Sequence, residues 1–296
     1  MNKTIIAIML SLLINVAAHA QYEPRNLAGE LGASLGTMSC NTDIEGKIAD
    51  PKSFKLSGGV YAALLYRQIA GLRLEATFGS VTADDKRSDK AKLRNRNLNF
   101  KSKIAEVSLL AELHPLEFVI RDYTPALSAY VLAGVGYFTF NPQALYNNTW
   151  VALQPLHTEG QGFAELDRPN YQLYAFNFSG GGGLRYNLSE RLTLRGEAVY
   201  RMLSTDYLDD VSTSYVRAAL FDKYLPKNVA DLAKILADRS SELAGGEPNT
   251  QTSRRGNPKN NDAYYSVSIK LGIKLDNFSN KGISKNARKS MGCYRF

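Results

Sequence analysis

The C-terminal part of the chain contains a segment, Tyr265 to Asp276, in which apolar and polar residues alternate without a break before an aromatic residue, Phe278. Successive residues of a strand point to opposite faces, so this strand has one apolar and one charged face over the thickness of a bilayer core. Such a strand suits a barrel in an outer membrane, but it would also suit a soluble sandwich. The rest of the chain has to decide between these two folds.

The N-terminus predicts export. Lys3 precedes a short apolar run, Ile5 to Val16, and a small-residue cleavage site ends at Ala20, as in a signal peptide. No cysteine follows that site, so we expect no lipid anchor. The predicted organisation is a signal peptide at 1–20, a barrel at 21–278 and a basic periplasmic tail at 279–296. Beyond the signal peptide no run of about 18 apolar residues occurs, so any membrane spans must be strands.

Seven further segments resemble the first strand. The predicted strands are 26–38, 54–66, 70–82, 99–113, 125–140, 171–188, 190–204 and 262–276. Short connections alternate strictly with long ones, the long ones being 39–53, 83–98, 141–170 and 205–261. This order is typical of an outer-membrane barrel with periplasmic termini and long external loops. The sequence therefore predicts an all-β, eight-stranded antiparallel outer-membrane barrel.

The charged faces of these strands predict the content of the barrel lumen. A Lys or Arg at the lipid midplane costs about 2 to 4 kcal/mol, so the charged faces must point inward. Eight strands enclose a space that side chains fill, and acids and bases should pair there. We expect a lumen ion-pair plug without an open pore; a proton or ion pathway along the carboxylates is the alternative. Its predicted members are Glu30, Arg73, Glu75, Glu106, Glu112, Arg185, Arg195, Glu197, Arg201, Lys270 and Lys274.

The net charge of +8 predicts phosphate-bearing neighbours. In an exported protein these are outer-membrane lipid and lipopolysaccharide, and we expect no nucleic acid. Cys40 and Cys293 fall near opposite ends of the predicted barrel, too far apart for a disulfide. They are either two free thiols, or Cys293 forms a mixed disulfide with a periplasmic partner.

The residues offer little chemistry. His157 could form a catalytic group only with Asp206, Asp209 or Asp210, and nothing marks a nucleophile, so no enzyme, cofactor or metal is expected. The spacing of these aspartates matches no calcium loop, and pairing with Arg239, Arg254 or Arg255 is favoured. Gly180 to Gly183 lies inside a strand, where glycines let the strand bend or let a bulky lumen side chain approach. The segments 215–225 and 229–237 are expected to be helices of a lid. Asn228 should cap the second helix, and one face should present Val229, Leu232, Ile235 and Leu236.

Several motifs resemble the PorG-like outer-membrane barrels of Bacteroidetes. The first strand carries Glu30, Gly32, Leu35 and Gly36, and Asp84-Asp85, Asn95-Arg96-Asn97-Leu98 and Phe100 precede or open the fourth. In the long loops the resemblance rests on Glu159, Gln161, Asp206, Tyr207, Asp209, Asp210, Arg239 and Arg255. It covers about 26–276, nearly the whole mature chain.

This resemblance implies a non-enzymatic role in type IX secretion, in which the barrel anchors a periplasmic ring of PorK and PorN. The alternative is a small surface binding or adhesion barrel that acts through its external loops. The tail 279–296 departs from the family pattern; it is either a disordered extension or a docking segment for an acidic partner or lipid head groups. Residues that we predict could contact a periplasmic partner are Arg67, His114, Arg121, Arg288, Lys289 and Cys293.

Overall fold

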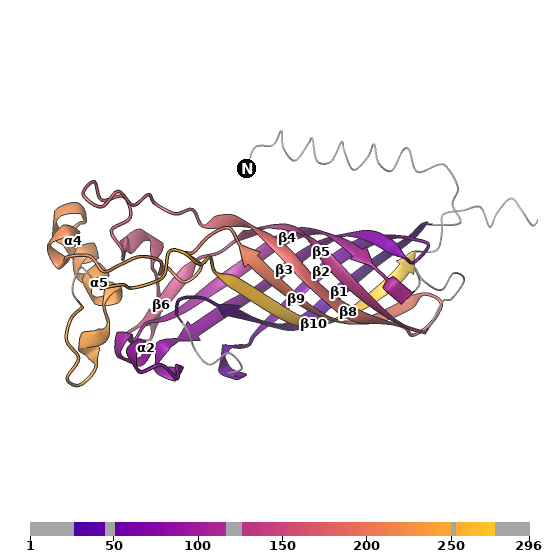
Figure 1. Ribbon diagram of the computed structural model, residues 1–296, viewed down its shortest axis with the longest axis horizontal. Coiled ribbons are helices and arrows are strands. Elements are labelled where there is room, and N and C mark those ends of the chain that lie inside the picture. The colour runs from indigo at the N-terminus through magenta and orange to yellow at the C-terminus, as the bar shows by residue number, and fades with distance from the viewer. Residues whose placement is uncertain (1–26, 45–50, 117–125, 250–252, 276–296) are drawn as a thin grey trace, which may run out of the picture.

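The computed structural model describes residues 27–44, 51–116, 126–249 and 253–275. The predicted signal peptide, Phe278 and the basic tail lie outside these residues. Eight long antiparallel strands form a closed barrel (Figure 1), which confirms the predicted fold class. They are β1 (Leu27–Asn41), β2 (Lys55–Tyr66), β3 (Ala70–Asp84), β4 (Asn99–Leu113), β5 (Leu127–Thr139), β8 (Tyr174–Asn187), β9 (Leu192–Leu203) and β10 (Ala263–Leu275).

Closure joins the first strand to the last. β1 pairs with β10 from Gly29 opposite Leu275 to Asn41 opposite Ala263, and β3 pairs with β4 along its whole length. A closed barrel has no free edge, so its backbone groups are satisfied within the sheet, as a membrane requires.

The outer wall of the barrel is apolar. Leu35, Phe176 and Ile269, on three different strands, keep 63%, 63% and 64% of their surfaces exposed. Tyr137 contacts the rings of Tyr174 and Phe176 at 5.8 and 5.4 Å, which places aromatic residues at the outer end of this wall. Strands whose outward face is apolar and whose inward face is charged are suited to lipid outside and a polar lumen within. No helix in the described ranges is long and apolar enough to cross a membrane.

Glycine at two inward positions makes room for large lumen side chains. A Cβ on Gly272 would lie 2.5 Å from both the Glu30 Oε1 and Tyr61 Oη atoms, and one on Gly183 would lie 2.9 Å from the Tyr130 ring. Gly183 thus has the role expected for the run Gly180 to Gly183.

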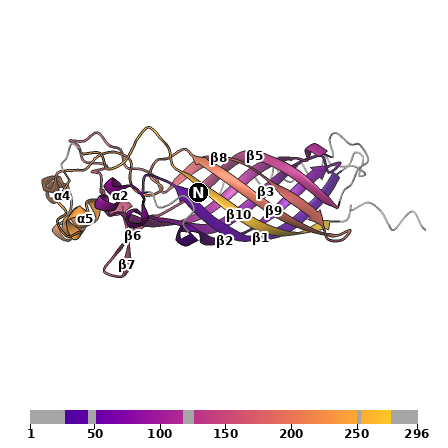
Figure 2. The ribbon, with the colours of Figure 1, turned by 60° about the horizontal axis from the view of Figure 1, so that its bottom comes forward.

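The described parts of the four long connections form a layer beyond one end of the barrel, which we call the crown: 42–44 and 51–54, 85–98, 140–173 and 204–262 without 250–252 (Figures 1 and 2). Its helices are α2 (Ala91–Arg96), α4 (Ala218–Tyr224) and α5 (Lys227–Ala237), and its hairpin pairs β6 (Pro142–Tyr146) with β7 (Thr149–Ala152). Short 3-10 helices lie at η1 (Pro51–Ser53), η2 (Asp85–Arg87), η3 (Gln154–Leu156) and η4 (Ser240–Glu242).

The crown contains two apolar cores, and their positions qualify the expected lid. One core lies at the barrel mouth, where Leu208 and Val211 pack with Ile44, Tyr171 and Tyr264. The other joins α4 and α5 to Leu156 and Phe163, farther from the barrel (Figure 1). Loop 205–261 therefore covers the mouth through its first residues, while its helices lie outside that layer.

Two details of the predicted helix were wrong. α5 begins at Lys227 and Pro226 is its N-cap, because the fixed φ of proline suits a helix start and the helix begins two residues earlier than expected. Of the predicted apolar face, Leu236 is buried and Val229 and Leu232 are partly buried against the same core. Ala230, Ala233 and Ala237 complete the buried face. Ile235 is 37% exposed, because the helix packs closely against the crown through its alanines and Ile235 lies away from that contact.

Candidate functional site

The centre of the lumen is organised around Arg73 on β3. Its guanidinium nitrogens lie 3.2 Å from Glu75, 2.9 Å from Glu112 and 2.7 Å from Glu197. The Arg73 side chain is fully buried. A buried arginine with three carboxylates fills the cross-section of the barrel with charge-assisted contacts.

Two more cations extend this centre. Arg195 Nε lies 2.9 Å from Glu30 and its Nη1 lies 3.0 Å from Glu112. Lys270 Nζ lies 2.6 Å from Glu75 and 2.8 Å from Glu197. Of these four glutamates, all but Glu30 are shared with Arg73, so the ion pairs form one connected network.

Tyrosines complete the network. Tyr61 donates its hydroxyl to Glu30 at 2.7 Å, and Tyr130 donates to Glu197 at 2.7 Å. The Arg195 guanidinium lies over both rings, 5.6 and 5.3 Å from their centroids. The sequence prediction did not include these tyrosines, although both occupy inward positions of the alternating pattern.

The predicted lumen residues fall into three groups. Glu30, Arg73, Glu75, Glu112, Arg195, Glu197 and Lys270 form the central network. Nearer the crown, Arg201 Nε lies 2.7 Å from Glu106, and Asn177 donates to the same carboxylate at 3.0 Å. At the opposite end, Arg185 donates to Gln68 at 2.8 Å and Lys274 to Asn187 at 2.8 Å.

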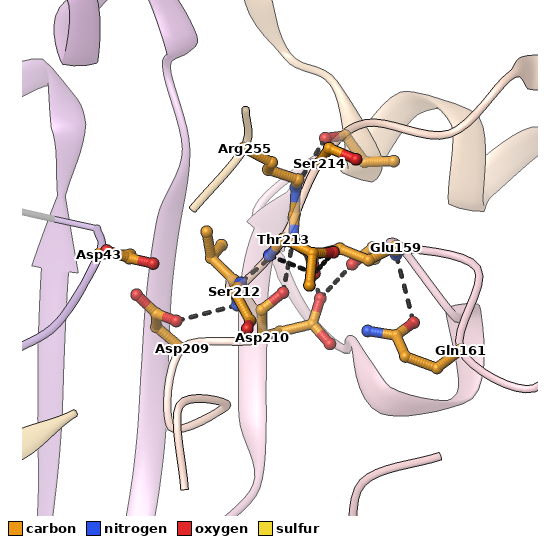
Figure 3. A network of polar contacts seen from close by, with 12 residues as sticks. Asp43, Glu159, Gln161, Asp209, Asp210, Ser212, Thr213, Ser214 and Arg255 are labelled. Atoms are coloured by element: carbon orange, nitrogen blue, oxygen red, sulfur yellow. Dashed lines mark hydrogen bonds and ion pairs between the residues drawn. The ribbon is translucent and has the colours of Figure 1, made fainter. Parts of the chain in front are cut away.

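A second polar network lies in the crown around Glu159 (Figure 3). The Glu159 carboxylate accepts hydrogen bonds from the Ser212 N–H at 3.0 Å, from the Thr213 N–H at 2.8 Å and from the Thr213 hydroxyl at 2.6 Å. Arg255 Nη1 lies 3.2 Å from it, and the Glu159 N–H donates to Gln161 Oε1 at 3.2 Å. Glu159 thus ties the loop 140–173 to both halves of the loop 204–262.

Asp210 and Arg255 belong to the same network. Arg255 donates to the Asp210 carbonyl at 2.5 Å and to the Ala237 carbonyl at 3.1 Å. Asp210 accepts hydrogen bonds from the hydroxyls of Thr158 and Tyr171. Burial raises the pKa of Asp210 to about 6. Of the predicted aspartate–arginine pairs, the structure brings Asp210 to Arg255, at 3.9 Å.

The remaining predicted loop residues have other contacts. Arg239 lies 2.8 Å from Glu242 and donates to the Leu145 carbonyl at 2.9 Å. The Tyr207 ring stacks on Tyr171 with centroids 4.6 Å apart.

Asp209 lies in a group of buried carboxyls between the barrel mouth and the crown. It accepts the Ile44 N–H at 2.7 Å, and Asp262 accepts the Leu208 N–H at 2.9 Å. Burial raises the pKa of Asp209 to about 8 and that of Asp206 to about 7, and it raises the pKa values of Asp43 and Asp262 as well. Across the described ranges, no three His, Cys, Asp or Glu side chains are grouped so that they could hold a metal ion.

Arg96 holds a third loop in the crown. It makes two contacts with Asp85, at 2.7 and 2.9 Å, and donates to the carbonyls of Arg255 and Asp43 at 2.5 and 2.7 Å. The sequence prediction named Arg96 and Asp85 only as family motif residues and not as site residues. Both lie in the long connection 83–98, which carries many charged residues, so a charge there does not reveal its partner.

A cavity of about 880 Å³ opens in the crown between α2 and the segment 240–257. Its lining carries more positive than negative side chains: Lys90, Lys92, Arg96, Arg254 and Arg255 against Asp43 and Glu247. Arg96 and Arg255 are bound to carboxylates.

At the other end of the barrel, the structure places two of the residues predicted to contact a partner. Arg67 is exposed in the turn between β2 and β3, with its guanidinium 5.6 Å from the Tyr66 ring. His114 is fully buried, 3.0 Å from the Ser128 hydroxyl and 3.6 Å from Glu112, so its prediction as a contact residue was wrong. His114 directly follows β4 and has the same parity as Glu112, so its side chain continues the inward face of the strand. Arg121, Arg288, Lys289 and Cys293 lie outside the described residues, and Cys40 is a free thiol.

Comparison with solved structures gives distant matches to small outer-membrane barrels. Neisserial surface protein A is 10% identical, with 84% of this chain and 97% of that chain covered and a TM-score of 0.36. OprG from Pseudomonas aeruginosa is 13% identical, with 84% and 95% covered and a TM-score of 0.37. Outer membrane protein W from E. coli is 14% identical, with 84% and 98% covered and a TM-score of 0.34.

No curated protein matches the chain. A family model described as a domain of unknown function, DUF6089, matches residues 3–154, just over half of the sequence. The chain therefore belongs to the DUF6089 family.

Proposed function

We propose that this protein is a non-enzymatic outer-membrane barrel that anchors a periplasmic protein assembly, the PorK/PorN-type ring of type IX secretion. The observation that carries the proposal is the filled lumen. Arg73, Arg195 and Lys270 occupy the barrel centre with their carboxylate partners at 2.6 to 3.2 Å. A barrel of this kind leaves no route for a solute, so its work lies at its two ends.

The secretion role comes from the motif resemblance to PorG-like barrels. Glu159, Asp210, Arg255 and Arg96 are among the motif residues, and each is buried in contacts between crown loops. Because these residues hold the crown together, the resemblance supports a shared architecture. On this proposal the crown faces outward and the short turns face the periplasm, so the ring binds at the short turns.

Co-purification tests the proposal. The tagged full chain is extracted from membranes of its own organism in mild detergent, and PorK- and PorN-like proteins should accompany it. Deletion of the gene should stop export of type IX cargo. If the ring proteins never accompany the barrel and export continues in its absence, the proposal is wrong.

A matched pair of variants then separates the two ends. Arg67→Glu changes an exposed charge in the β2–β3 turn, and Lys86→Glu changes an exposed charge in the crown. We expect only the first to weaken recovery of the ring, because only that end faces the periplasm on this proposal. Equal recovery with both variants would exclude the Arg67 turn as a contact.

A second function has one observation in its favour. The crown cavity carries the cations Lys92 and Arg254 at its exposed edge, which suits an acidic polysaccharide and a role as a surface binding or adhesion barrel. The double variant Lys92→Ala with Arg254→Ala should reduce binding of an acidic polysaccharide to whole cells, while Lys86→Ala should not. Unchanged binding in the double variant would remove this candidate.

A further inference from the structure

The outer wall of the barrel carries charge at one place. Within the eight described barrel strands, the outward-facing positions hold two cations, Lys101 and Lys103, both on β4. Asp84, the last residue of β3, also has outward parity, but its carboxylate caps η2 by accepting the Lys86 N–H. The other outward positions of these strands are uncharged, so the two lysines interrupt the wall on one side only.

The register places the lysines just beyond the apolar wall. Ala105 pairs with Phe78 on one side and with Thr139 on the other, and Lys103 pairs with Ser80 in the next outward row. One strand repeat of two residues is about 6.8 Å. A chain lying along Phe78, which is 58% exposed, would therefore bring its end group to the lysines.

A groove connects these residues. A cavity of about 520 Å³ on this side of the barrel is lined by Phe78, Ala105 and Thr139 and also by Lys101 and Lys103. It has an apolar part toward the barrel wall and a cationic part toward the crown. This is the arrangement of an acyl chain joined to an anionic head group.

Both lysine charges are available to a ligand. In the parts of the chain that the structure describes, neither ammonium lies within ion-pair distance of a carboxylate. Lys101 instead lies 5.5 Å from the ring centroid of Trp150, which is 40% exposed on the β6–β7 hairpin. Tryptophan and lysine side by side are typical of a membrane–water interface.

We propose that Lys101 and Lys103 bind the phosphate of an acylated lipid in the outer leaflet, with one acyl chain along Phe78 and Ala105. This rests on the proposed function in one respect, that the barrel lies in an outer membrane. The groove is lined by residues of the barrel strands, with Phe140 and Asn141 of the crown at one end, so a lipid on the apolar wall reaches both of its parts. A soluble anion would use the lysines alone.

Lipid retention tests the proposal. The full chain is inserted into nanodiscs of phosphatidylcholine that contain a small fraction of diphosphorylated lipid A, and native mass spectrometry counts the lipids that remain bound. The double variant Lys101→Gln with Lys103→Gln is compared with Lys86→Gln combined with Lys259→Gln, two exposed crown lysines outside the groove. Each lysine should attract the phosphorylated lipid by about 1 kcal/mol. Loss of both lysines should therefore lower the enrichment of lipid A by roughly 30-fold in the groove variant. The control pair should keep the enrichment.

The acyl part has its own matched pair. Phe78→Asn should weaken retention of lipid A, whereas Phe178→Asn, an equally exposed position on β8 at 61%, should not. The deacylated phosphorylated disaccharide and inorganic phosphate should not displace the lipid at equal concentration. Equal displacement by either, or full enrichment in the lysine variant, would overturn the proposal.

The outcome is separable from that of the anchoring function. The lipid assay contains no ring proteins, and the ring assay does not depend on lipid A enrichment. A chain that fails to enter nanodiscs contradicts the membrane barrel itself. A chain that enters and shows no preference for the phosphorylated lipid contradicts the lysine site alone.

Discussion

Arg73 shows what a buried charge does in this molecule. Its three carboxylate partners lie on three different strands, β3, β4 and β9. A buried pair gains little over an apolar pair of the same shape, but removal of one partner leaves a charge without compensation. The network therefore fixes which strands meet in the lumen more than it adds net stability.

Replacement of Arg73 by methionine should destabilise the barrel by about 3 to 5 kcal/mol, because Glu112 and Glu197 lose a contact that water cannot replace. Urea unfolding in detergent micelles measures this change. Lys223→Ala is the control, because Lys223 pairs with Glu165 on the surface, where an ion pair contributes little. Equal midpoints for wild type and the Arg73 variant would show that the network is dispensable.

Asp209 predicts how the crown responds to pH. Burial raises its pKa from 3.8 to about 8 in the folded chain. Between about pH 4 and pH 8 the folded state holds a proton that the unfolded state has released, so stability falls as pH rises through this window. The same sign holds for Asp206, whose pKa is raised to about 7. The total loss is on the order of a few kcal/mol.

Fluorescence of Trp150, the single tryptophan, reports unfolding of the crown across this range of pH. Asp209→Asn should flatten the fall in stability between pH 5 and pH 8. The variant should also be less stable than the wild type at low pH, because asparagine has one acceptor oxygen and Asp209 accepts two backbone N–H groups. The exposed Asp231→Asn should leave the slope unchanged. A wild-type crown whose stability rises from pH 5 to pH 8 would contradict the burial of these carboxyls.

At the scale of elements, strands were predictable and crown elements were less so. All eight barrel strands follow from alternation, because a charged face and a lipid face leave no other register. The β6–β7 hairpin was missed, since it is short and Asn147 and Asn148 adopt positive φ in a turn that the pattern alone does not separate from a loop. α5 was found, and Leu236, Val229 and Leu232 of its predicted apolar face do pack against the core. Ile235 does not, because alanines form the rest of the buried face.

Sequence separation explains why the lumen could be predicted better than the crown. Arg73, Glu112 and Lys270 occupy inward positions of their strands. The alternating pattern therefore placed their side chains in the lumen, although it did not show which of them pair. Glu159 and Arg255 are far apart in the sequence and meet only after two loops have folded. No local pattern predicts such a contact, so apart from the pairing of Asp210 with Arg255 the crown network was visible only as family motifs.

α5 should depend on its small and apolar buried face. Leu236 is 1% exposed and Ile235 is 37% exposed. Leu236→Ala should cost about 2 to 5 kcal/mol in the crown, whereas Ile235→Ala should change stability much less. Hydrogen exchange of the helix 227–237 measures both. If the two variants exchange alike, the orientation of α5 in the crown is wrong.

At the scale of the whole molecule, the described residues form two packed layers in series along the barrel. The lumen network fills the barrel from Glu106 and Arg201 near the crown to Arg195 and Glu30 deeper in. Beyond it, Leu208, Val211 and Tyr171 close the mouth, and α4 and α5 lie outside that closure. We expect either layer alone to block a solute.

Single-channel recording in planar bilayers follows from this arrangement. The purified full chain should show no stable conductance step. Replacement of the helices 218–237 by a flexible linker should also leave it closed, because neither seal is made by α4 or α5. A step in the wild type would contradict the filled lumen. A step that appears only in the helix replacement would place the seal in the outer crown, and the ion pairs around Arg73 would then serve register and stability and not closure.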